Sequence, residues 1–503
     1  MKKIKILHNR YVDSVTLMSV GERVVAEAGA ENAEAQMATP ANLEVLNMLG
    51  YSVPSSAGPN DLVLAVTAKD GETAERALQL LEDCLNHKAD DNRVYHSLDE
   101  IDLQEDPYDL VQISLPGKYA AAEAEKAIRK GLDVFIFSDN VPIEEEVRIK
   151  KLGIECGCLV MGPDCGVGIL KGVALAAGSV VRKGRIGIIG ASGSGAQEVS
   201  CVIERCGAGV SSLIGTGGRD LSREVGGLTM LYALEKLEND EETDVIVLVS
   251  KVADRQVMEK VLTRADGCKK PVVAVFLGAD KEMFAAHRVH YAEFLADAAL
   301  IAVRLAGGKT ASIMTQDEID ALAEAECKKY GKEQKYLRAL YCGGTFAEES
   351  VLYWKQELPF VKFCGNVPGT EKGNADTAGH AVLDLGAEEY TQCAPHPVFE
   401  PALRNAKLQK ILDDERTAVA VFDVITGPGV HVHPADEAAK LCREAISRRG
   451  GKLTVIANIC GAEGDPQNVK RIAEELRAAG VIVTGSNKDS ACLAAAILRR
   501  LGA

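Results

Sequence analysis

The sequence predicts an α/β protein made of three tandem Rossmann- or flavodoxin-like domains, each built on a parallel sheet. From about residue 110, short apolar runs alternate with glycine-containing turns and amphipathic stretches, which is the pattern of βαβ units. The length of 503 residues suits about three domains of roughly 100–200 residues each. Strands and helices after residue 335 also repeat the order of those after residue 183, which indicates an internal duplication. We place the domains at 1–182, 183–310 and 335–503, joined by a linker helix at 311–334.

In the first domain, the regular pattern of βαβ units begins only at about residue 110. Residues 1–100 show little periodicity, and only 71–85 predict a helix there. Further on, Gly131 ends one helical pattern and Pro142 begins the next. The expected elements are strands at 109–115, 133–139 and 158–162, with helices at 117–131 and 142–153.

The second and third domains share an order of strand, glycine turn and helix. In the second, we expect strands at 185–191, 209–215, 244–251 and 271–278, with helices at 192–207, 227–240 and 254–264. In the third, we expect strands at 337–344, 418–424 and 451–461, and a closing helix at 488–501.

Composition excludes several classes of partner. The chain has 57 Lys and Arg against 73 Asp and Glu, a net charge of −16, and no long basic run. Nucleic-acid binding needs clustered cations, so we expect no nucleic-acid partner. No apolar run approaches the roughly 20 residues that a membrane helix needs, and the N-terminal residues turn polar too early for a signal peptide. We therefore expect a cytoplasmic protein without membrane contact.

Glycine-rich turns between strands and helices are the candidate anion sites. Ser192, Gly193, Ser194 and Gly195 follow a strand and enter a helix, where backbone N–H groups and the helix dipole favour phosphate or carboxylate. The alternative is a tight turn that needs glycine only for its geometry. Two later turns have the same character, with Arg219 as an anion clamp or a loop-fixing ion pair and Thr345 as a helix N-cap. Their candidate residues are Gly217, Gly218, Arg219, Gly343, Gly344 and Thr345.

Three further motifs carry reactive side chains. Two prolines flank His396 just before a predicted helix, so His396 is either a residue that handles an oxyanion, a proton or a phosphoryl group, or a structural histidine. Cys165 lies in the motif Gly162-Pro163-Asp164-Cys165 at the end of a strand. We interpret this motif as a rigid turn and not as the site of a nucleophilic cysteine. His431-Val432-His433 suggests a metal by composition only, and such loop histidines are usually exposed, so we expect no metal.

The order of these motifs resembles the succinyl-CoA synthetase superfamily of NDP-forming acyl-CoA synthetases. GPDCGVG is similar to its CoA-domain turn, and KGRIGIIGASGSGAQE followed by GTGG is similar to its α-type ligase domain. The unit from residue 335 resembles the β-type ligase domain. The resemblance is stronger to the FdrA family, on the motifs DSVTLMS, ATPAN, FSDNVPIEEE, VMGPDCG, GIIGASGSG, GGRDLSREVGG and PHPVFEP.

The resemblance implies acyl- or carbamoyl-phosphate chemistry in which Ser192 and His396 are catalytic. The FdrA family implies a subunit of an oxamate carbamoyltransferase complex, in which oxalurate and phosphate give oxamate and carbamoyl phosphate. It also implies a small carbonyl substrate, phosphate, partner subunits and an oligomer, with CoA as a second candidate ligand. The CoA-like or substrate crevice would be lined by Pro116, Ser138, Asp139, Asn140, Gly162, Pro163, Asp164 and Cys165.

The sequence departs from the superfamily at the phosphohistidine motif. Where GHAGA is expected, the chain reads ADKEMFAAHRVHYAEF, so that role is assigned to neither His287 nor His290. No ATP-grasp-like segment precedes residue 335. Two alternatives remain open, namely an acyl-CoA synthetase subunit that needs a separate ATP-grasp partner, and a non-catalytic scaffold or sensor.

Overall fold

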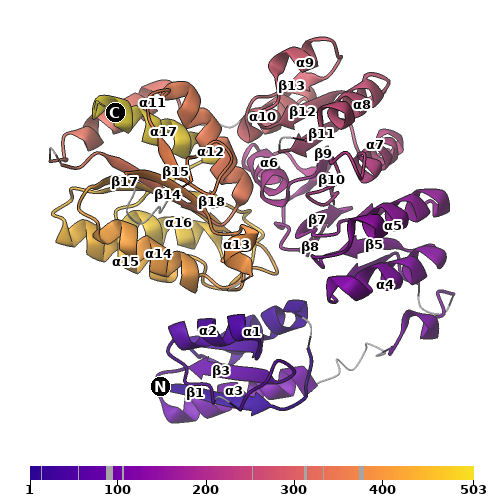
Figure 1. The fold of residues 1–503 in the computed structure, drawn as a ribbon, viewed down its shortest axis with the longest axis horizontal. Helices are drawn as coiled ribbons and strands as arrows, with labels where there is room; N and C mark the ends of the chain where they lie inside the picture. The colour runs from indigo at the N-terminus through magenta and orange to yellow at the C-terminus, as the bar shows by residue number, and fades with distance from the viewer. Residues whose placement is uncertain are drawn as a thin grey trace. The chain divides into compact units, whose positions relative to one another are not determined.

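The computed structural model describes the chain except residues 13, 55, 87–94, 105–106, 252, 311–313, 332, 373–378, 393 and 503. The chain forms two compact units. Unit 1 contains residues 1–109, 387–403 and 429–432, and unit 2 contains residues 110–386, 404–428 and 433–503. Figure 1 shows the elements of both units in chain order.

Unit 1 is built on a small antiparallel sheet that the sequence analysis did not predict. Its strand order is β1-β3-β2. Leu62, Leu64 and Val66 alternate along β3 and pack against α1 and α3, whereas Val63 and Ala65 face α2 on the other side. The elements are β1 (Lys2–Leu7), α1 (Ser14–Ala28), β2 (Asn32–Met37), α2 (Pro40–Met48), β3 (Leu62–Thr67), α3 (Gly71–Asn86), a 3₁₀ turn (Leu98–Glu100) and α13 (Glu388–Thr391).

Unit 2 begins with a short parallel sheet of order β4-β5-β6. Its elements are β4 (Leu110–Ile113), α4 (Gly117–Arg129), β5 (Asp133–Ile136), α5 (Ile143–Cys156) and β6 (Val160–Met161). A buried lysine connects this part to the next sheet. Lys150 on α5 donates hydrogen bonds of 2.8 Å to Glu146 Oε1 and to Asp220 Oδ1, and one of 2.9 Å to the Thr216 carbonyl. Because all three side chains are buried, each charge depends on the others for compensation.

The second sheet has the order β13-β12-β11-β9-β10-β7-β8, in which β9 to β13 are parallel and β7 and β8 form an antiparallel extension. The strands are β7 (Val167–Leu170), β8 (Val173–Ala176), β9 (Lys183–Gly190), β10 (Val210–Gly215), β11 (Val245–Ser250), β12 (Val272–Phe276) and β13 (His290–Tyr291). The helices are α6 (Gly193–Arg205), α7 (Leu228–Asn239), α8 (Arg255–Asp266), α9 (Lys281–Ala285) and α10 (Leu295–Leu305).

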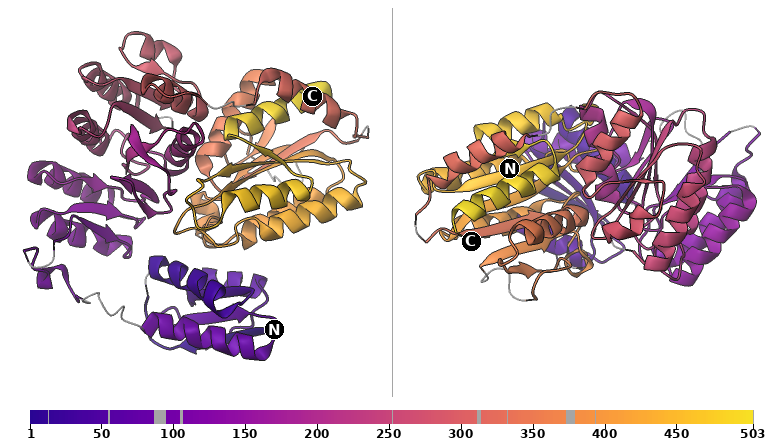
Figure 2. Two further views of the ribbon diagram at one scale, coloured as in Figure 1. Left: turned by 180° about the vertical axis from the view of Figure 1, so that it is seen from behind. Right: turned by 90° about the horizontal axis from the view of Figure 1, so that it is seen from above.

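The third sheet is parallel, with the order β15-β16-β14-β17-β18-β19. Its helices lie on both faces (Figure 2). The strands are β14 (Tyr336–Tyr341), β15 (Phe363–Gly365), β16 (His380–Asp384), β17 (Thr417–Ile425), β18 (Thr454–Cys460) and β19 (Ile482–Thr484). The helices are α12 (Gly344–Glu357), α14 (Ala402–Asp413), α15 (Asp436–Arg448), α16 (Val469–Ala478) and α17 (Asn487–Arg500), together with α11 (Gln316–Cys327) inside the predicted linker, whose residues 311–313 and 332 lie outside the described residues.

The α/β class with several parallel sheets is confirmed. The core of the second sheet reads β10-β9-β11-β12-β13 and that of the third reads β16-β14-β17-β18-β19. In both, the first strand lies between the second and the third, which is the doubly wound order 2-1-3-4-5. The shared order agrees with the predicted duplication. No helix in the described part of the chain is long and apolar enough to cross a membrane.

A buried polar network fixes α6, α12 and α17 to one another. The Asn487 backbone N–H, at the start of α17, donates to Glu198 Oε1 on α6 at 2.8 Å. Its side-chain amide donates to Glu349 Oε2 on α12 at 2.7 Å, and the Leu295 N–H donates to the other Glu349 oxygen at 2.7 Å. Burial raises the pKa of Glu349 to about 7, although these hydrogen bonds oppose the shift.

We predict that the Glu349 network makes the protein less stable as the pH rises from 5 to 8. The folded state holds the Glu349 proton up to about pH 7, whereas the unfolded chain releases it near pH 4.5, so unfolding is favoured as the pH rises between these values. The raised pKa values of Asp384 and Asp489, each about 6, act in the same direction. Thermal unfolding of the parent and of Glu349→Gln across this range measures the contribution, which we expect to be about 1–3 kcal/mol.

The control is Glu444→Gln, at an exposed position on α15. The slope of stability against pH should flatten in Glu349→Gln and stay parental in the control. Equal slopes in all three proteins would contradict the buried, protonated carboxyl. A constant loss of stability from the substitution itself shifts the whole curve and leaves this comparison intact.

Candidate functional site

The helix starts of α6 and α12 meet within unit 2. Ser192 is the N-cap of α6, and its Oγ accepts a hydrogen bond from the Gly195 N–H at 3.1 Å. The same Oγ lies 2.5 Å from Thr345 Oγ1 in the first turn of α12. Figure 1 shows the two helices side by side. The sequence analysis treated these glycine turns as separate candidates, and the fold brings them together.

Glycine allows the two helix starts to approach so closely. A Cβ atom on Gly195 would lie 2.8 Å from Ser192 Oγ and 3.0 Å from Thr345 Cγ2. A Cβ atom on Gly343 would lie 3.0 Å from the Ser194 Cβ. Gly193 differs, since the nearest atom to its added Cβ would be at 3.7 Å. The first-turn N–H groups of both helices, which have no acceptor within their own helix, are therefore concentrated in one place.

The expected N-cap role of Thr345 is wrong, because Gly343 occupies the N-cap position. A buried carboxylate shapes the turn instead. Asp423, on β17, accepts hydrogen bonds from the Cys342 N–H at 2.7 Å and from the Gly343 N–H at 2.8 Å. Burial nevertheless raises the pKa of Asp423. The Gly343 N–H is thus already paired with Asp423. Gly344 and Thr345 lie in the first turn of α12.

Two charged residues beside α12 escaped the sequence analysis. Lys251 follows β11 directly, and its Nζ lies 2.7 Å from Glu348 Oε1 on α12. Asp384 ends β16, and burial raises its pKa to about 6 while the Lys251 charge opposes the shift. A Cβ on Gly344 would lie 2.4 Å from Asp384 Oδ2 and 3.3 Å from Lys251 Nζ. The signal was available, because both residues follow parallel strands at their carboxyl ends, where ligands of such sheets bind.

The second glycine loop is adjacent to the first. β10 pairs with β9 so that Gly215 lies opposite Gly190, and the Thr216 N–H donates to the Gly190 carbonyl. Gly217, at φ +85°, packs against the Gly162-Pro163 turn, whereas nothing lies within 4 Å of a Cβ added to Gly218. Arg219 is bound to α5, where it pairs with Glu146 Oε2 at 2.8 Å and donates to the Val141 carbonyl.

The residues of the predicted crevice meet at the carboxyl ends of β4, β5 and β6. The Asp164 N–H donates to the Ser138 carbonyl, and the Ser138 hydroxyl donates to the Ile113 carbonyl. Gly117, which follows the Pro116 N-cap of α4, packs on the backbone of Asp139 and Asn140.

Charged side chains of both signs act at this edge. Burial, reinforced by the neighbouring Asp139 carboxylate, raises the pKa of Asp164 to about 6. The positive charges of Arg219 and Lys251 oppose this shift, so cations as well as carboxylates act at this edge. Cys165 is not placed to act as a nucleophile. Burial raises the pKa of its thiol to about 12, and the thiol donates to the Val167 carbonyl.

His396 belongs to unit 1, whereas Ser192 belongs to unit 2. Its ring Nδ1 accepts the Val398 N–H at 3.2 Å, and its carbonyl accepts the N–H groups of Phe399 and Glu400. Burial lowers the pKa of His396 to about 4, so the ring is neutral at pH 7. It does not lie at a helix start, because α14 begins only at Ala402.

The two loop histidines differ from the expectation of exposure. The His431 side chain is only 14 % exposed and lies beside Glu34, while that of His433 is 34 % exposed and contacts Asp436. His431, Glu34 and Glu400 form a cluster whose carboxylates come from distant parts of the sequence. Because Glu34 and Glu400 are far from His431 in the sequence, the residues around His431 do not reveal this cluster.

Comparisons with known proteins agree with this architecture. The model of the AllF heavy metal-associated domain matches residues 1–99, that of the CoA binding domain matches 181–277, and that of the CoA-ligase family matches 340–497. The Escherichia coli K12 protein YahF is 37 % identical over 503 residues, which covers 98 % of each chain.

More distant relatives match only a part of the chain. SauD, a subunit of the ADP-forming sulfoacetate-CoA ligase of Bilophila wadsworthia, is 29 % identical over 37 % of this chain and 64 % of its own. The succinate-CoA ligase α subunit of Methanothermobacter thermautotrophicus is 28 % identical over 37 % and 62 %. Among solved structures, the dinucleotide-forming acetyl-coenzyme A synthetase 1 of Ca. Korarchaeum cryptofilum is similar over 81 % of this chain and 85 % of its own, with a TM-score of 0.29 and 15 % identity.

YahF matches the full length, and the CoA-binding and CoA-ligase models match the second and third sheets, where the glycine turns GIIGASGSG and YCGGT enter α6 and α12. The chain belongs to the FdrA family of succinyl-CoA synthetase-like proteins.

Proposed function

We propose that this chain is a subunit of an enzyme that transfers an acyl or carbamoyl group to or from phosphate at the junction of α6 and α12. One observation carries the proposal, namely the contact between Ser192 and Thr345, which places two helix N-termini side by side. The reaction that the family resemblance favours is the conversion of oxalurate and phosphate into oxamate and carbamoyl phosphate. The complex would be cytoplasmic and oligomeric, with partner subunits.

The two helix starts suit the charge of the reaction. Each helix presents roughly half a positive charge at its N-terminus, and the Lys251 ammonium, which pairs with Glu348, lies beside α12. A phosphate ion and the anionic tetrahedral intermediate that it forms would both be stabilised by these groups. Gly193 is exposed, and an added Cβ would meet only Val167 Cγ2, at 3.7 Å, so the start of α6 is uncrowded and open to such an anion.

The proposed step exchanges one bond at the carbonyl carbon for another. A phosphate oxygen bonds to the carbamoyl carbon, the C–N bond to oxamate breaks, and the leaving nitrogen takes a proton. Asp384, whose pKa is about 6, titrates in the range needed to accept a proton from phosphate and return it to the nitrogen. His396 belongs to unit 1, its ring is neutral at pH 7, and the sequence analysis names it as a second catalytic residue.

A second candidate function is supported by the partial relatives. SauD and the succinate-CoA ligase α chain are subunits of CoA ligases, as their names state. By analogy, this chain would bind CoA and require a separate nucleotide-binding subunit. At the predicted crevice, Asp139 and Asp164 would disfavour the phosphate end of CoA, whereas the nearby charges of Arg219 and Lys251 would favour it.

We predict that Gly193→Val and Lys251→Met each weaken the binding of phosphate or carbamoyl phosphate at least tenfold. The valine fills space in front of the α6 amides, where an added Cβ would meet only Val167 Cγ2 at 3.7 Å. The methionine removes the positive charge of Lys251 while keeping most of the length of the side chain. Calorimetric titration of the intact chain measures the affinities.

The matched controls are Gly267→Val, at the C-cap of α8, and Lys260→Met, at an exposed position on the same helix. Both should bind as the parent does. Parental affinity in the two site variants would rule out the α6–α12 junction as the anion site.

We predict that Ser192→Ala and His396→Gln each lower turnover about 10²- to 10⁴-fold while the protein stays folded. Ser192→Ala also removes a helix cap, which costs about 1 kcal/mol of stability. Carbamoyl phosphate formation from oxalurate and phosphate, assayed in the assembled complex, measures turnover. Full activity of His396→Gln would remove His396 from the proposal and leave Asp384 as the proton carrier.

We predict that phosphate and carbamoyl phosphate raise the melting temperature of the chain, whereas CoA and ATP leave it unchanged. A ligand at a hundredfold excess over its dissociation constant stabilises the folded state by about 2.7 kcal/mol. Scanning the intact chain with each compound separately tests this. Stabilisation by CoA alone would favour the CoA-ligase subunit instead.

A further inference from the structure

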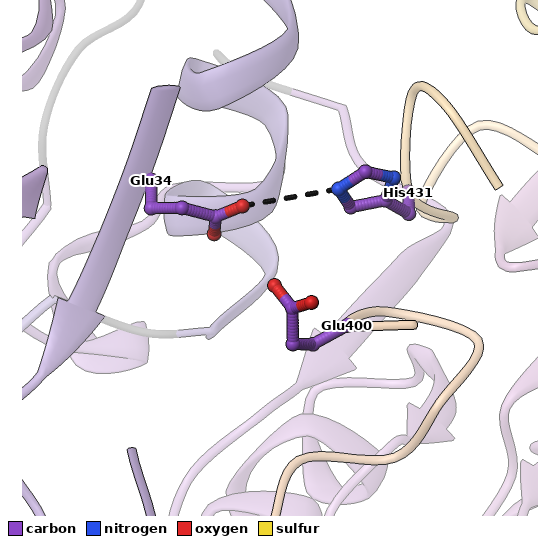
Figure 3. A group of neighbouring side chains, drawn as sticks. All are labelled: Glu34, Glu400 and His431. Atoms are coloured by element: carbon purple, nitrogen blue, oxygen red, sulfur yellow. Dashed lines mark ion pairs between the residues drawn. The ribbon is translucent and has the colours of Figure 1, made fainter. Parts of the chain in front are cut away.

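Three segments of unit 1 bring ligand-type side chains to one point. Glu34 lies on β2, Glu400 precedes α14, and His431 lies in the short stretch 429–432. Figure 3 shows the two carboxylates and the imidazole ring facing one another. From these side chains we propose that unit 1 contains a binding site for a divalent first-row transition metal ion. The inference is independent of the proposed enzymatic function.

The spacing of the three groups suits one ion. One carboxylate oxygen of each glutamate and one ring nitrogen of His431 all lie within 4.8 Å of one another, and Glu34 Oε1 is 3.8 Å from His431 Nε2. In a tetrahedral site with bonds of about 2.1 Å, neighbouring ligand atoms are about 3.4 Å apart. Small side-chain rotations would close the difference.

Electrostatics favours a cation at this point. Glu400 is 4 % exposed and the Glu34 side chain is 13 % exposed, so their charges are poorly screened by water. Both carboxylates also act on Tyr51 nearby, where burial first and these two charges next raise the pKa to about 12. An ion of charge +2 would remove the repulsion between the carboxylates, and the His431 imidazole would complete the site.

Neighbouring groups hold the three side chains in place. The Asn32 amide donates to Glu34 Oε1 and the Gln36 amide donates to Glu34 Oε2, at 3.3 and 3.2 Å. The Ala402 N–H donates to Glu400 Oε1 at 3.0 Å. The His431 N–H donates to the Val398 carbonyl at 3.2 Å, which joins the two C-terminal segments. Hydrogen bonds of this kind orient ligands in metal sites.

The donor set indicates the class of metal. Two carboxylates and one imidazole suit Zn²⁺, Co²⁺, Fe²⁺ or Mn²⁺, whereas Cu⁺ prefers thiolate or thioether ligands. In a tetrahedral site, three protein ligands leave the fourth coordination position of the metal ion for water or another group. The residues come from opposite ends of the chain, so the ion would cross-link β2 to the segments 387–403 and 429–432.

The test uses the intact chain, stripped of metal with a chelator and dialysed. Titration with Co²⁺, followed by its visible absorption, should show one site per chain, and added Zn²⁺ should displace the colour. Glu400→Gln and His431→Gln should each weaken binding at least tenfold. Glu31→Gln, at an exposed position before β2, and His433→Gln, two residues from His431, are the matched controls and should bind as the parent does.

Melting curves of all variants without metal show whether each is folded. In the parent and in both controls, saturating Zn²⁺ should raise the melting temperature, and in the two site variants it should not. The proposal is overturned if the stripped parent takes up no Co²⁺ or Zn²⁺, which would leave a His431–Glu34 ion pair. It is equally overturned if folded Glu400→Gln and His431→Gln proteins bind Co²⁺ with parental affinity.

Discussion

The Asn487 hydrogen bonds to two buried glutamates are the constraint on which the arrangement of unit 2 depends. Glu198 lies on α6 and Glu349 on α12, and both helices begin at the junction where Ser192 meets Thr345. The Asn487 hydrogen bonds lie one or two helical turns from these two helix starts, and they therefore hold the helix starts in position relative to each other. Because the participating groups are buried, movement of either helix would expose or orphan a polar group, which costs free energy. The junction is thus rigid before any ligand arrives.

The sequence predicts much of unit 2, because local patterns determine it. Apolar runs become the strands β9 to β12, β14, β17 and β18, and Ser192 is followed by a helix as its glycine turn indicates. Contacts between turns that are distant in the sequence do not follow from these local patterns. The link from Ser192 to Thr345 joins two domains of the duplicated pattern. Lys251 and Asp384 stand out in the sequence only as residues at strand ends, and their meeting beside α12 depends on the strand order.

Unit 1 shows where the sequence is least informative. The strand NAEAQM alternates alanine with polar residues, so its apolar face is weak in the sequence, although Ala33 and Ala35 are buried against α1 and α3. On the other face lies Glu34, whose partners Glu400 and His431 come from the far end of the chain. Periodicity reports which residues face a core, and it carries no information about which distant loop covers the opposite face.

Unit 1 is discontinuous, and this has a consequence for synthesis on the ribosome. Residues 1–86 supply its sheet and main helices, but the stretches 387–403 and 429–432 that complete it emerge much later. At about 5–20 residues per second, the delay is on the order of tens of seconds. During that time the nascent sheet presents the face bearing Glu34 without its final cover. The order of translation therefore delays the completion of unit 1 until residue 432 has been made, although its first strand is made first.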